Sequence, residues 1–315
     1  MNLREQVESQ EPNFNPELNL LGGVFNSPGY HSRIPSGTWV HSTRTNIYYA
    51  LALLELGDDS SGRISVTYAP HAVYTVAEPI LRAVAEDSAR TGRVIHIHAS
   101  ETAREVEECV GAHGMSPVAY LDSLGVLGPR TVLAHAVHLS DEDIDIIRER
   151  KSWISHCPCS NFKLASGQFR YHKAVELGGC RFTLGTDGCA SNNNLSMLEE
   201  MKFAALSAKN ESGEPTAGRD GDILHAATRA GAEAFGIDAG LIEEGKLADA
   251  LLVDLAHPLM TPDYHLAANL VYSADSSVID TVICDGRILM ENRRIDGEEE
   301  ILADARRTCV RLRNL

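Results

Sequence analysis

Apolar and polar residues follow two alternating rhythms from about residue 63 onward. Short runs of β-forming residues are separated by longer segments in which apolar residues recur every three or four positions. The first rhythm is typical of buried strands and the second of amphipathic helices. The predicted strands are Arg63–Tyr68, Val94–Ala99, Thr131–His135, Trp153–His156 and Phe182–Thr186. Because strands and helices alternate, the pattern indicates successive βα units and a parallel sheet.

The predicted helices are marked by their ends as well as by their apolar spacing. Thr75-Val-Ala-Glu78 has the pattern of a capping box, Pro79 stands in the first turn, and Gly92 closes that helix. The acidic run Glu105–Glu108 is predicted to be a solvated face. Further helical material extends to about Leu127, and other helices are predicted over Asp141–Arg150, near Tyr171–Leu177, over Leu195–Ala208 and over Asp222–Phe235.

The pattern divides the chain into three parts. Residues 1–62 form a divergent N-terminal segment with an apolar helix over Asn46–Leu56, residues 63–237 hold the βα units, and residues 238–315 form a β appendage and tail. Within the last part, Cys284-Asp285-Gly286 is typical of a hairpin turn.

Composition narrows the class of protein. The chain is 43% apolar, lacks an unbroken apolar run of membrane-spanning length, and begins with a polar, acidic segment unlike a signal peptide, so we expect a cytoplasmic protein. Its net charge of −16 disfavours nucleic acid and anionic membranes as partners. The seven cysteines are odd in number, which predicts reduced thiols, and the pair Cys157-Pro-Cys159 is a weak metal signal that we interpret as ordinary packing.

Polar, potentially reactive residues follow the predicted strands. They are His71, His98 with Glu101, His135, His156 and Asp187. In a (β/α)8 barrel the active site lies at the carboxyl ends of the strands, so this placement predicts one shared site. A doubly wound sheet also binds ligands at strand ends, and periodicity alone does not separate the two folds.

The residue types at these strand ends suit a zinc hydrolase. Such an enzyme needs imidazole and carboxylate ligands, a coordination position for water, and a nearby acid or base. His98 and Asp187 are the candidate metal ligands, Glu101 is the candidate proton shuttle, and His135 is the candidate group that orients the hydrolytic water.

Five ordered motifs resemble the amidohydrolase superfamily, in the branch of methylthioadenosine/S-adenosylhomocysteine deaminases and triazine hydrolases. The similarity covers roughly residues 63–290. The motifs are PHAVYT (Pro70–Thr75), HIHASET (His96–Thr102), LAHAVHL (Leu133–Leu139), SHCPCSNFKL (Ser155–Leu164) and LGTDGCASNN (Leu184–Asn193).

The resemblance implies a TIM-barrel-like α/β fold, incomplete at its N-terminal strands, with a small C-terminal β-sandwich remnant. It implies one Zn²⁺ bound by His98 and Asp187, with Glu101 protonating the substrate ring and His135 beside the water. It also implies that His71, Glu101 and Asp187 bind the substrate. The expected function is zinc-dependent hydrolytic deamination of an aminopurine nucleoside such as methylthioadenosine, S-adenosylhomocysteine or adenosine. The expected partner is therefore a small molecule, and a homo-oligomer is left open.

One element of the family pattern is absent from residues 1–62. The family's strand-one HxH pair supplies two zinc ligands, whereas His31 and His41 are the only histidines there and stand ten positions apart. We favour a truncated gene product. The alternatives are an inactive homologue that binds a small molecule or partner, replacement ligands from residues 1–62, a minority role for His96 as a ligand, and chlorohydrolase or guanine deaminase activity.

Overall fold

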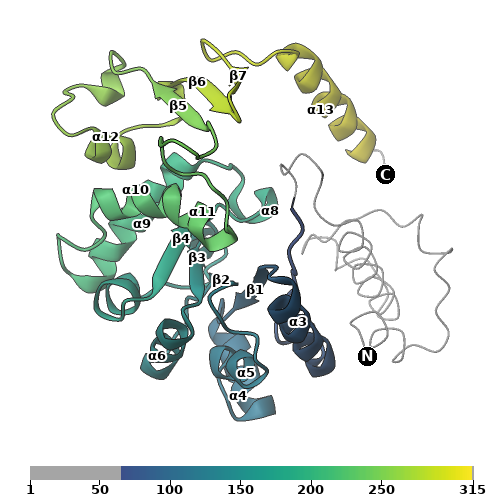
Figure 1. Cartoon of the computed structure of the whole chain (residues 1–315). Coiled ribbons are helices and arrows are strands. Elements are labelled where there is room, and N and C mark those ends of the chain that lie inside the picture. The colour runs from purple at the N-terminus through teal and green to yellow at the C-terminus, as the bar shows by residue number, and fades with distance from the viewer. Residues whose placement is uncertain (1–64, 314–315) are drawn as a thin grey trace.

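Four parallel strands form the larger sheet in the computed structural model, which describes residues 65–313 (Figure 1). The predictions for residues 1–64 lie outside that range. The sheet has the order β1-β2-β3-β4, so each strand lies beside its neighbour in sequence. The strands are β1 (Ile95–Ala99), β2 (Thr131–His135), β3 (Trp153–His156) and β4 (Arg181–Leu184).

The predicted strand at Arg63–Tyr68 is reduced, within its described residues, to one parallel bridge between Tyr68 and Ile95. The Tyr68 amide donates to the carbonyl of Val94 at 2.9 Å, and the Tyr68 carbonyl accepts from the His96 amide at 2.8 Å. The chain around Tyr68 therefore lies along the free side of β1.

Burial explains why these segments form strands. β2 and β3 are buried at every position, as expected for parallel strands covered on both faces. In β1 the residues Ile95, Ile97 and Ala99 are buried, while His96 and His98 on the opposite face are only partly buried. Side-chain alternation along β1 thus places both histidines on the same side of the sheet.

Helices follow the strands as the pattern predicted, and they surround the sheet in Figure 1. The predicted helix over Asp222–Phe235 is interrupted at Thr228, which lies between two shorter helices. The helical segments are α3 (Glu78–Thr91), α4 (Ala103–His113), α5 (Pro117–Ser123), α6 (Asp141–Arg150), α7 (Pro158–Lys163), the π-helical η3 (His172–Leu177), α8 (Cys189–Asn192), α9 (Met197–Ser212), α10 (Asp220–Ala227) and α11 (Arg229–Phe235).

The predicted capping box at Thr75 is wrong. Helix α3 begins after Ala77, which makes no side-chain cap, and the Thr75 hydroxyl instead donates to the carbonyl of Ala72 at 3.2 Å. Pro79 removes one amide from the first turn, so this helix start needs fewer acceptors. The predicted end is confirmed, because Gly92 adopts a left-handed conformation with φ of 78°.

A smaller antiparallel sheet forms the C-terminal appendage. The predicted hairpin turn is confirmed, because Asp285 and Gly286 both have positive φ, 50° and 71°, between β6 and β7. The segments are β5 (Ala250–Val253), the 3₁₀ turn η4 (Pro258–Met260), α12 (Leu266–Tyr272), the 3₁₀ turn η5 (Ser276–Val278), β6 (Ile279–Cys284), β7 (Arg287–Met290) and α13 (Glu298–Arg313).

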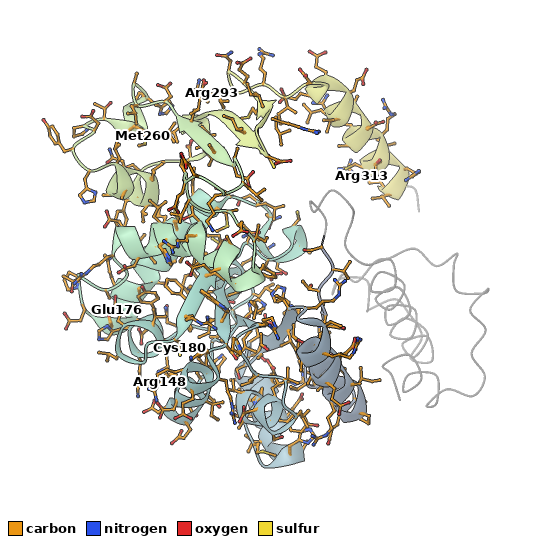
Figure 2. The ribbon with its side chains drawn as sticks, viewed as in Figure 1. Arg148, Glu176, Cys180, Met260, Arg293 and Arg313 are labelled. Carbon is orange, nitrogen blue, oxygen red and sulfur yellow. The ribbon has the colours of Figure 1, made fainter. Side chains whose placement is uncertain are left out.

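The appendage has its own small core around Met260 and Val278, which are fully buried, and Met260 is labelled in Figure 2. Helix α12 packs against α9 and α10 and so joins the appendage to the larger sheet. Within residues 65–313, none of the helices combines the length and apolar composition that crossing a membrane requires.

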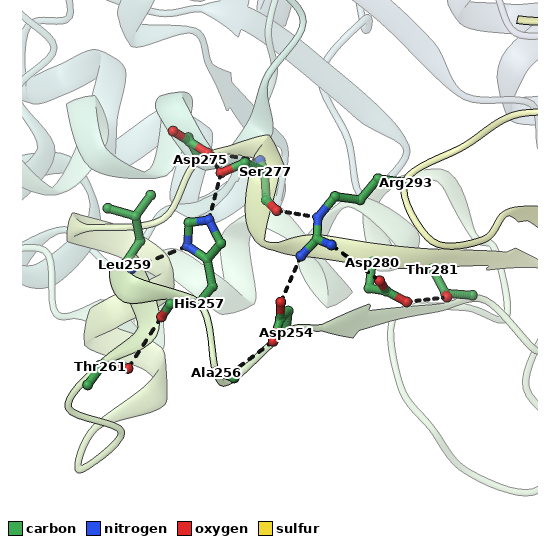
Figure 3. A network of polar contacts seen from close by, with 10 residues as sticks. All are labelled: Asp254, Ala256, His257, Leu259, Thr261, Asp275, Ser277, Asp280, Thr281 and Arg293. Atoms are coloured by element: carbon green, nitrogen blue, oxygen red, sulfur yellow. Dashed lines mark hydrogen bonds and ion pairs between the residues drawn. The ribbon is translucent and has the colours of Figure 1, made fainter.

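Exposed charges hold the strands of the appendage together (Figure 3). The Arg293 guanidinium donates to Asp254 Oδ2 and to the carbonyl of Ser277, each at 2.8 Å, and lies 3.5 Å from Asp280. The Ser277 hydroxyl donates to Asp275 and lies 3.4 Å from the Nε2 of His257. Because the Nδ1 of His257 accepts from the Leu259 amide, its Nε2 carries the proton and cannot act as a base toward Ser277. This network is therefore structural.

Candidate active site

The candidate catalytic residues lie at the carboxyl ends of β1, β2 and β4. Four residues there have left-handed backbones, Ser100 with φ of 53°, His135 with 70°, Ala136 with 49° and Asp187 with 58°. This conformation is uncommon outside glycine, and such residues concentrate at functional sites. The chain therefore turns sharply at these strand ends, where it presents polar side chains.

His135 is the centre of the candidate site. Its Nε2 lies 3.8 Å from Glu101 Oε2, and its Nδ1 lies 2.8 Å from Asn161 Oδ1. Its ring stacks on that of His98 with centroids 5.4 Å apart. With the amide oxygen of Asn161 facing Nδ1, Nδ1–H donates to it, and Nε2 is the nitrogen that faces Glu101. This arrangement suits a group that holds a water molecule or accepts its proton.

His98 is oriented by the chain that precedes β1. Its Nδ1 lies 2.8 Å from the carbonyl oxygen of His71, so Nδ1–H donates and Nε2 keeps its lone pair. A ring fixed in this way is typical of a metal-binding histidine. The His71 ring lies 4.9 Å from the His98 ring, which places this predicted substrate contact beside the candidate ligand.

Asp187 is held as a carboxylate. Its Oδ2 accepts from the Ser160 hydroxyl at 2.7 Å, and its Oδ1 accepts from the Gly188 amide at 2.6 Å. Burial acts to raise the pKa of Asp187, but these hydrogen bonds and the nearby His135 outweigh it, so the pKa lies below its ordinary value. An ionised carboxylate can serve as a metal ligand or as a proton acceptor.

Helix α7 supplies two site residues that the sequence analysis missed. Ser160 contacts Asp187, and Asn161 contacts His135, although both side chains are almost completely buried. The signal in the sequence was a pair of consecutive polar residues directly after the turn Cys157-Pro-Cys159. Only the geometry of this short helix shows that Ser160 contacts the residue after β4 and that Asn161 contacts the last residue of β2.

Glu200 of α9 connects α7 to the segment that carries Asp187. Its Oε2 accepts from the Cys159 amide at 3.2 Å, and its Oε1 accepts from Asn192 Nδ2 at 2.6 Å. Asn192 also donates to the carbonyl of Thr186 at 2.7 Å. The side chain of Glu200 is fully buried, and burial raises its pKa. This carboxylate therefore fixes the two sides of the site relative to each other.

Glu101 lies near a second buried carboxylate. Glu101 Oε1 accepts from the Ser166 hydroxyl at 3.0 Å. The prediction that Glu105–Glu108 is a solvated face is wrong for Glu105, which is 5% exposed, and holds for Glu107 and Glu108. Glu105 lies on the inner side of α4, where its carboxylate meets the amides of Ser100 and Glu101.

Two further histidines belong to the sheet, His96 within β1 and His156 at the last position of β3. His96 packs edge-on against Phe235 at 5.8 Å, and burial lowers its pKa to about 4. His156 is 2% exposed, packs 4.7 Å from Phe169, and has its pKa lowered by burial to about 3. Neither ring nitrogen of His156 has a hydrogen-bond partner in the described part of the chain. Both rings are therefore neutral packing elements at neutral pH.

The described residues do not complete a zinc site. Over residues 65–313, no group of three or more His, Cys, Asp or Glu side chains is arranged to hold a metal ion. Catalytic zinc usually has three protein ligands, whereas His98 and Asp187 are two. The Cys157 thiol does not add a third, because burial raises its pKa to about 12 and Asp187 and Glu200 add to that effect.

Comparison with known families and proteins finds clear similarities to this chain. Residues 42–289 match the model of the Amidohydrolase family. The chain is 48% identical to a 5'-deoxyadenosine deaminase of Methanothermobacter thermautotrophicus, over 77% of this chain and 56% of that protein. It is 43% identical to a 5-methylthioadenosine/S-adenosylhomocysteine deaminase of Pelotomaculum thermopropionicum, over 82% of this chain and 60% of that protein. The chain thus spans less than two thirds of the length of these relatives.

Solved structures share the fold. A zinc-bound adenosine deaminase of Xanthomonas campestris has a TM-score of 0.81 and 33% identity, over 87% of this chain and 63% of that one. Atrazine chlorohydrolase of Arthrobacter aurescens, complexed with zinc, has a TM-score of 0.75 and 25% identity, over 83% of this chain and 58% of that one. These similarities confirm the predicted α/β fold class.

Proposed function

Because the chain belongs to the amidohydrolase family, we propose that it takes part in the hydrolytic deamination of an adenosine-like nucleoside. The names of its relatives support 5'-deoxyadenosine, methylthioadenosine and S-adenosylhomocysteine as candidate substrates. The observation that carries the proposal is the position of His135, stacked on His98 and 3.8 Å from Glu101.

The proposed roles follow from the contacts of each residue. Glu101 gives a proton to the ring nitrogen beside the amino-bearing carbon, and the Ser166 hydroxyl holds its carboxyl group in place. His135 orients the attacking water through Nε2, because Asn161 occupies Nδ1. Asp187 accepts one proton of the water and passes it to the leaving ammonia, while the hydroxyl of the tetrahedral intermediate returns the other proton to Glu101 as the carbonyl forms. His71 contacts the substrate beside His98.

Zinc is part of the proposal, because the deaminase and chlorohydrolase structures contain it. His98 and Asp187 would supply two ligands. Since residues 65–313 hold no larger donor group, the remaining ligands would come from outside that range.

A second candidate function is binding without catalysis. The incomplete donor group within residues 65–313 favours it. A protein of this kind would bind the nucleoside near His71, Glu101 and Asp187 but release no ammonia.

The test uses the full 315-residue chain. Zinc content is measured on the purified protein before and after incubation with zinc, and ammonia release is measured with 5'-deoxyadenosine, methylthioadenosine, S-adenosylhomocysteine and adenosine. The proposal predicts turnover of at least one nucleoside that depends on zinc. Binding detected by calorimetry together with no ammonia release at any zinc level would favour the second function and contradict the first.

A further inference from the structure

The turn after β1 carries the proposed proton donor in a demanding backbone conformation. Ser100 has a φ of 53°, in the left-handed region, and its backbone leads directly into Glu101. A left-handed residue that is not glycine persists only when its surroundings hold it there. Something next to this turn must therefore determine its shape.

The carboxylate of Glu105 contacts both amides of the turn. Its Oε1 accepts from the Ser100 amide at 3.0 Å, and its Oε2 accepts from the Glu101 amide at 2.7 Å. The side chain is buried, so these two bonds satisfy polar groups that would be costly to bury without partners. Two oxygens of one rigid group therefore fix two consecutive peptide units.

The contact differs from an ordinary helix cap. Thr102 caps α4 by accepting the Glu105 amide at 3.1 Å, and Glu105 stands at the third helical position, where a capping box would return its side chain to the Thr102 amide. Here the carboxylate reaches past Thr102 to the two residues before it. Its bonds hold the turn that carries Glu101 as well as the start of α4.

We propose that Glu105 is a positioning residue that holds the Glu101 carboxyl group toward His135 and Ser166. This inference rests on the proposed function for its catalytic consequence, and on the two amide contacts for its structural part. A displacement of a catalytic group by about 1 Å can cost roughly 10²-fold in rate. By fixing the backbone of Glu101, the Glu105 carboxylate therefore helps to maintain the reaction rate.

Four variants of the full chain separate this role from plain stabilisation of α4. Glu105→Gln keeps the size of the side chain but only one acceptor oxygen, and Glu105→Ala removes both. Thr102→Ala removes the ordinary cap and leaves the carboxylate in place. Glu107→Gln changes an exposed glutamate of the same helix and is the matched control.

Two measurements test whether Glu105 holds the turn, and neither of them requires catalytic turnover. Hydrogen exchange followed by NMR should be at least about tenfold faster at the Ser100 and Glu101 amides in Glu105→Ala, with a smaller change in Glu105→Gln. A crystal structure of Glu105→Gln should show the Glu101 carboxyl group displaced from Ser166 and His135. In Thr102→Ala and Glu107→Gln both features should match the wild type.

Steady-state kinetics test whether the position of Glu101 affects the reaction rate. Glu105→Gln should lower kcat by roughly ten- to a hundredfold and change KM by less than about twofold, because the substrate contacts are retained. Unchanged exchange and an unmoved Glu101 in both Glu105 variants would overturn the proposal. An equal displacement in Thr102→Ala would also overturn it. If the wild type releases no ammonia, the proposed function fails, and exchange and Glu101 position still decide the role of Glu105.

Discussion

The rim of the larger sheet and the C-terminal appendage use polar groups in opposite ways. At the rim, Glu105, Glu200 and Asn161 are 5%, 0% and 1% exposed, and each contacts a segment that carries a candidate catalytic residue. In the appendage, the side chains of Arg293 and Asp254 are 41% and 35% exposed.

The difference shows what each region needs from its polar groups. A buried polar group without a partner is costly, so a buried network permits few alternative arrangements. An exposed ion pair competes with water and contributes little. The rim therefore restricts the geometry of its residues, while the appendage needs only to keep its strands together.

Asp187→Asn gives the largest expected effect, because it removes the proposed proton acceptor of the rim. We expect deamination to fall by at least about 10²-fold, with the free energy of unfolding changed by less than about 1 kcal/mol. Ammonia release and urea denaturation measure the two effects. Asp285→Asn in the hairpin turn of the appendage is the control. Equal activity in the two variants would show that Asp187 matters no more for catalysis than a residue of the appendage.

Glu200→Ala tests the buried connection between α7 and the Asp187 segment. The Cys159 amide and the Asn192 side chain lose their acceptor, so we expect a destabilisation of about 3 kcal/mol in urea. Glu214→Ala, at an exposed position beyond α9, should change stability by less than about 0.5 kcal/mol. Similar losses in both variants would mean that burial of the carboxylate does not matter.

The buried ring of His156 makes the free energy of unfolding depend on pH. Its pKa in the folded chain is lowered to about 3 by burial, whereas the unfolded value is 6.5. The unfolded state therefore binds more protons below pH 6.5, and stability is fully present above that pH and falls as the pH drops toward 3.

A His156→Leu variant should lack this loss, which amounts to about 2 kcal/mol for the wild type between pH 7 and pH 5. Urea denaturation at both pH values gives the difference, and His225→Gln at an exposed position is the control. An identical pH dependence in His156→Leu and the wild type would contradict a buried neutral ring.

Arg293→Ala should give the smallest effect. It removes the ion pairs to Asp254 and Asp280, which are partly exposed, so the expected destabilisation is about 0.5 kcal/mol with activity unchanged. Arg294→Ala is the neighbouring control. A loss as large as that of Glu200→Ala would show that the appendage depends on its charges as strongly as the rim does.

The predictable part of the molecule is the part with strong local signals. The strands at Thr131–His135 and Trp153–His156 and the helix at Asp141–Arg150 match the structure residue for residue. The strands are apolar runs between turn signals, and the helix has a true capping box at Ser140 and Asp143. The carboxyl ends of the predicted strands also indicated the candidate site residues His98, Glu101, His135 and Asp187.

The contacts between these residues depend on packing that the sequence does not encode locally. Nothing in SHCPCSN shows that Ser160 meets Asp187 while Asn161 meets His135, because that depends on the tilt of α7. Glu105 belongs to an acidic run that is typical of a solvated face, and only the position of α4 turns it inward. Thr75 fits a capping pattern, but its turn and Pro79 place the start of α3 later. The boundaries of the three predicted parts of the chain and the roles of the site residues stay predictions.

The most direct test of the proposed chemistry is Glu101→Gln. The variant keeps the size of the side chain but cannot pass a proton to the substrate ring. With zinc supplied and 5'-deoxyadenosine as substrate, the account predicts ammonia release by the wild type and a fall in kcat of at least about 10²-fold in Glu101→Gln. A variant that releases ammonia at the wild-type rate would contradict the assignment of Glu101 as the proton donor of this site.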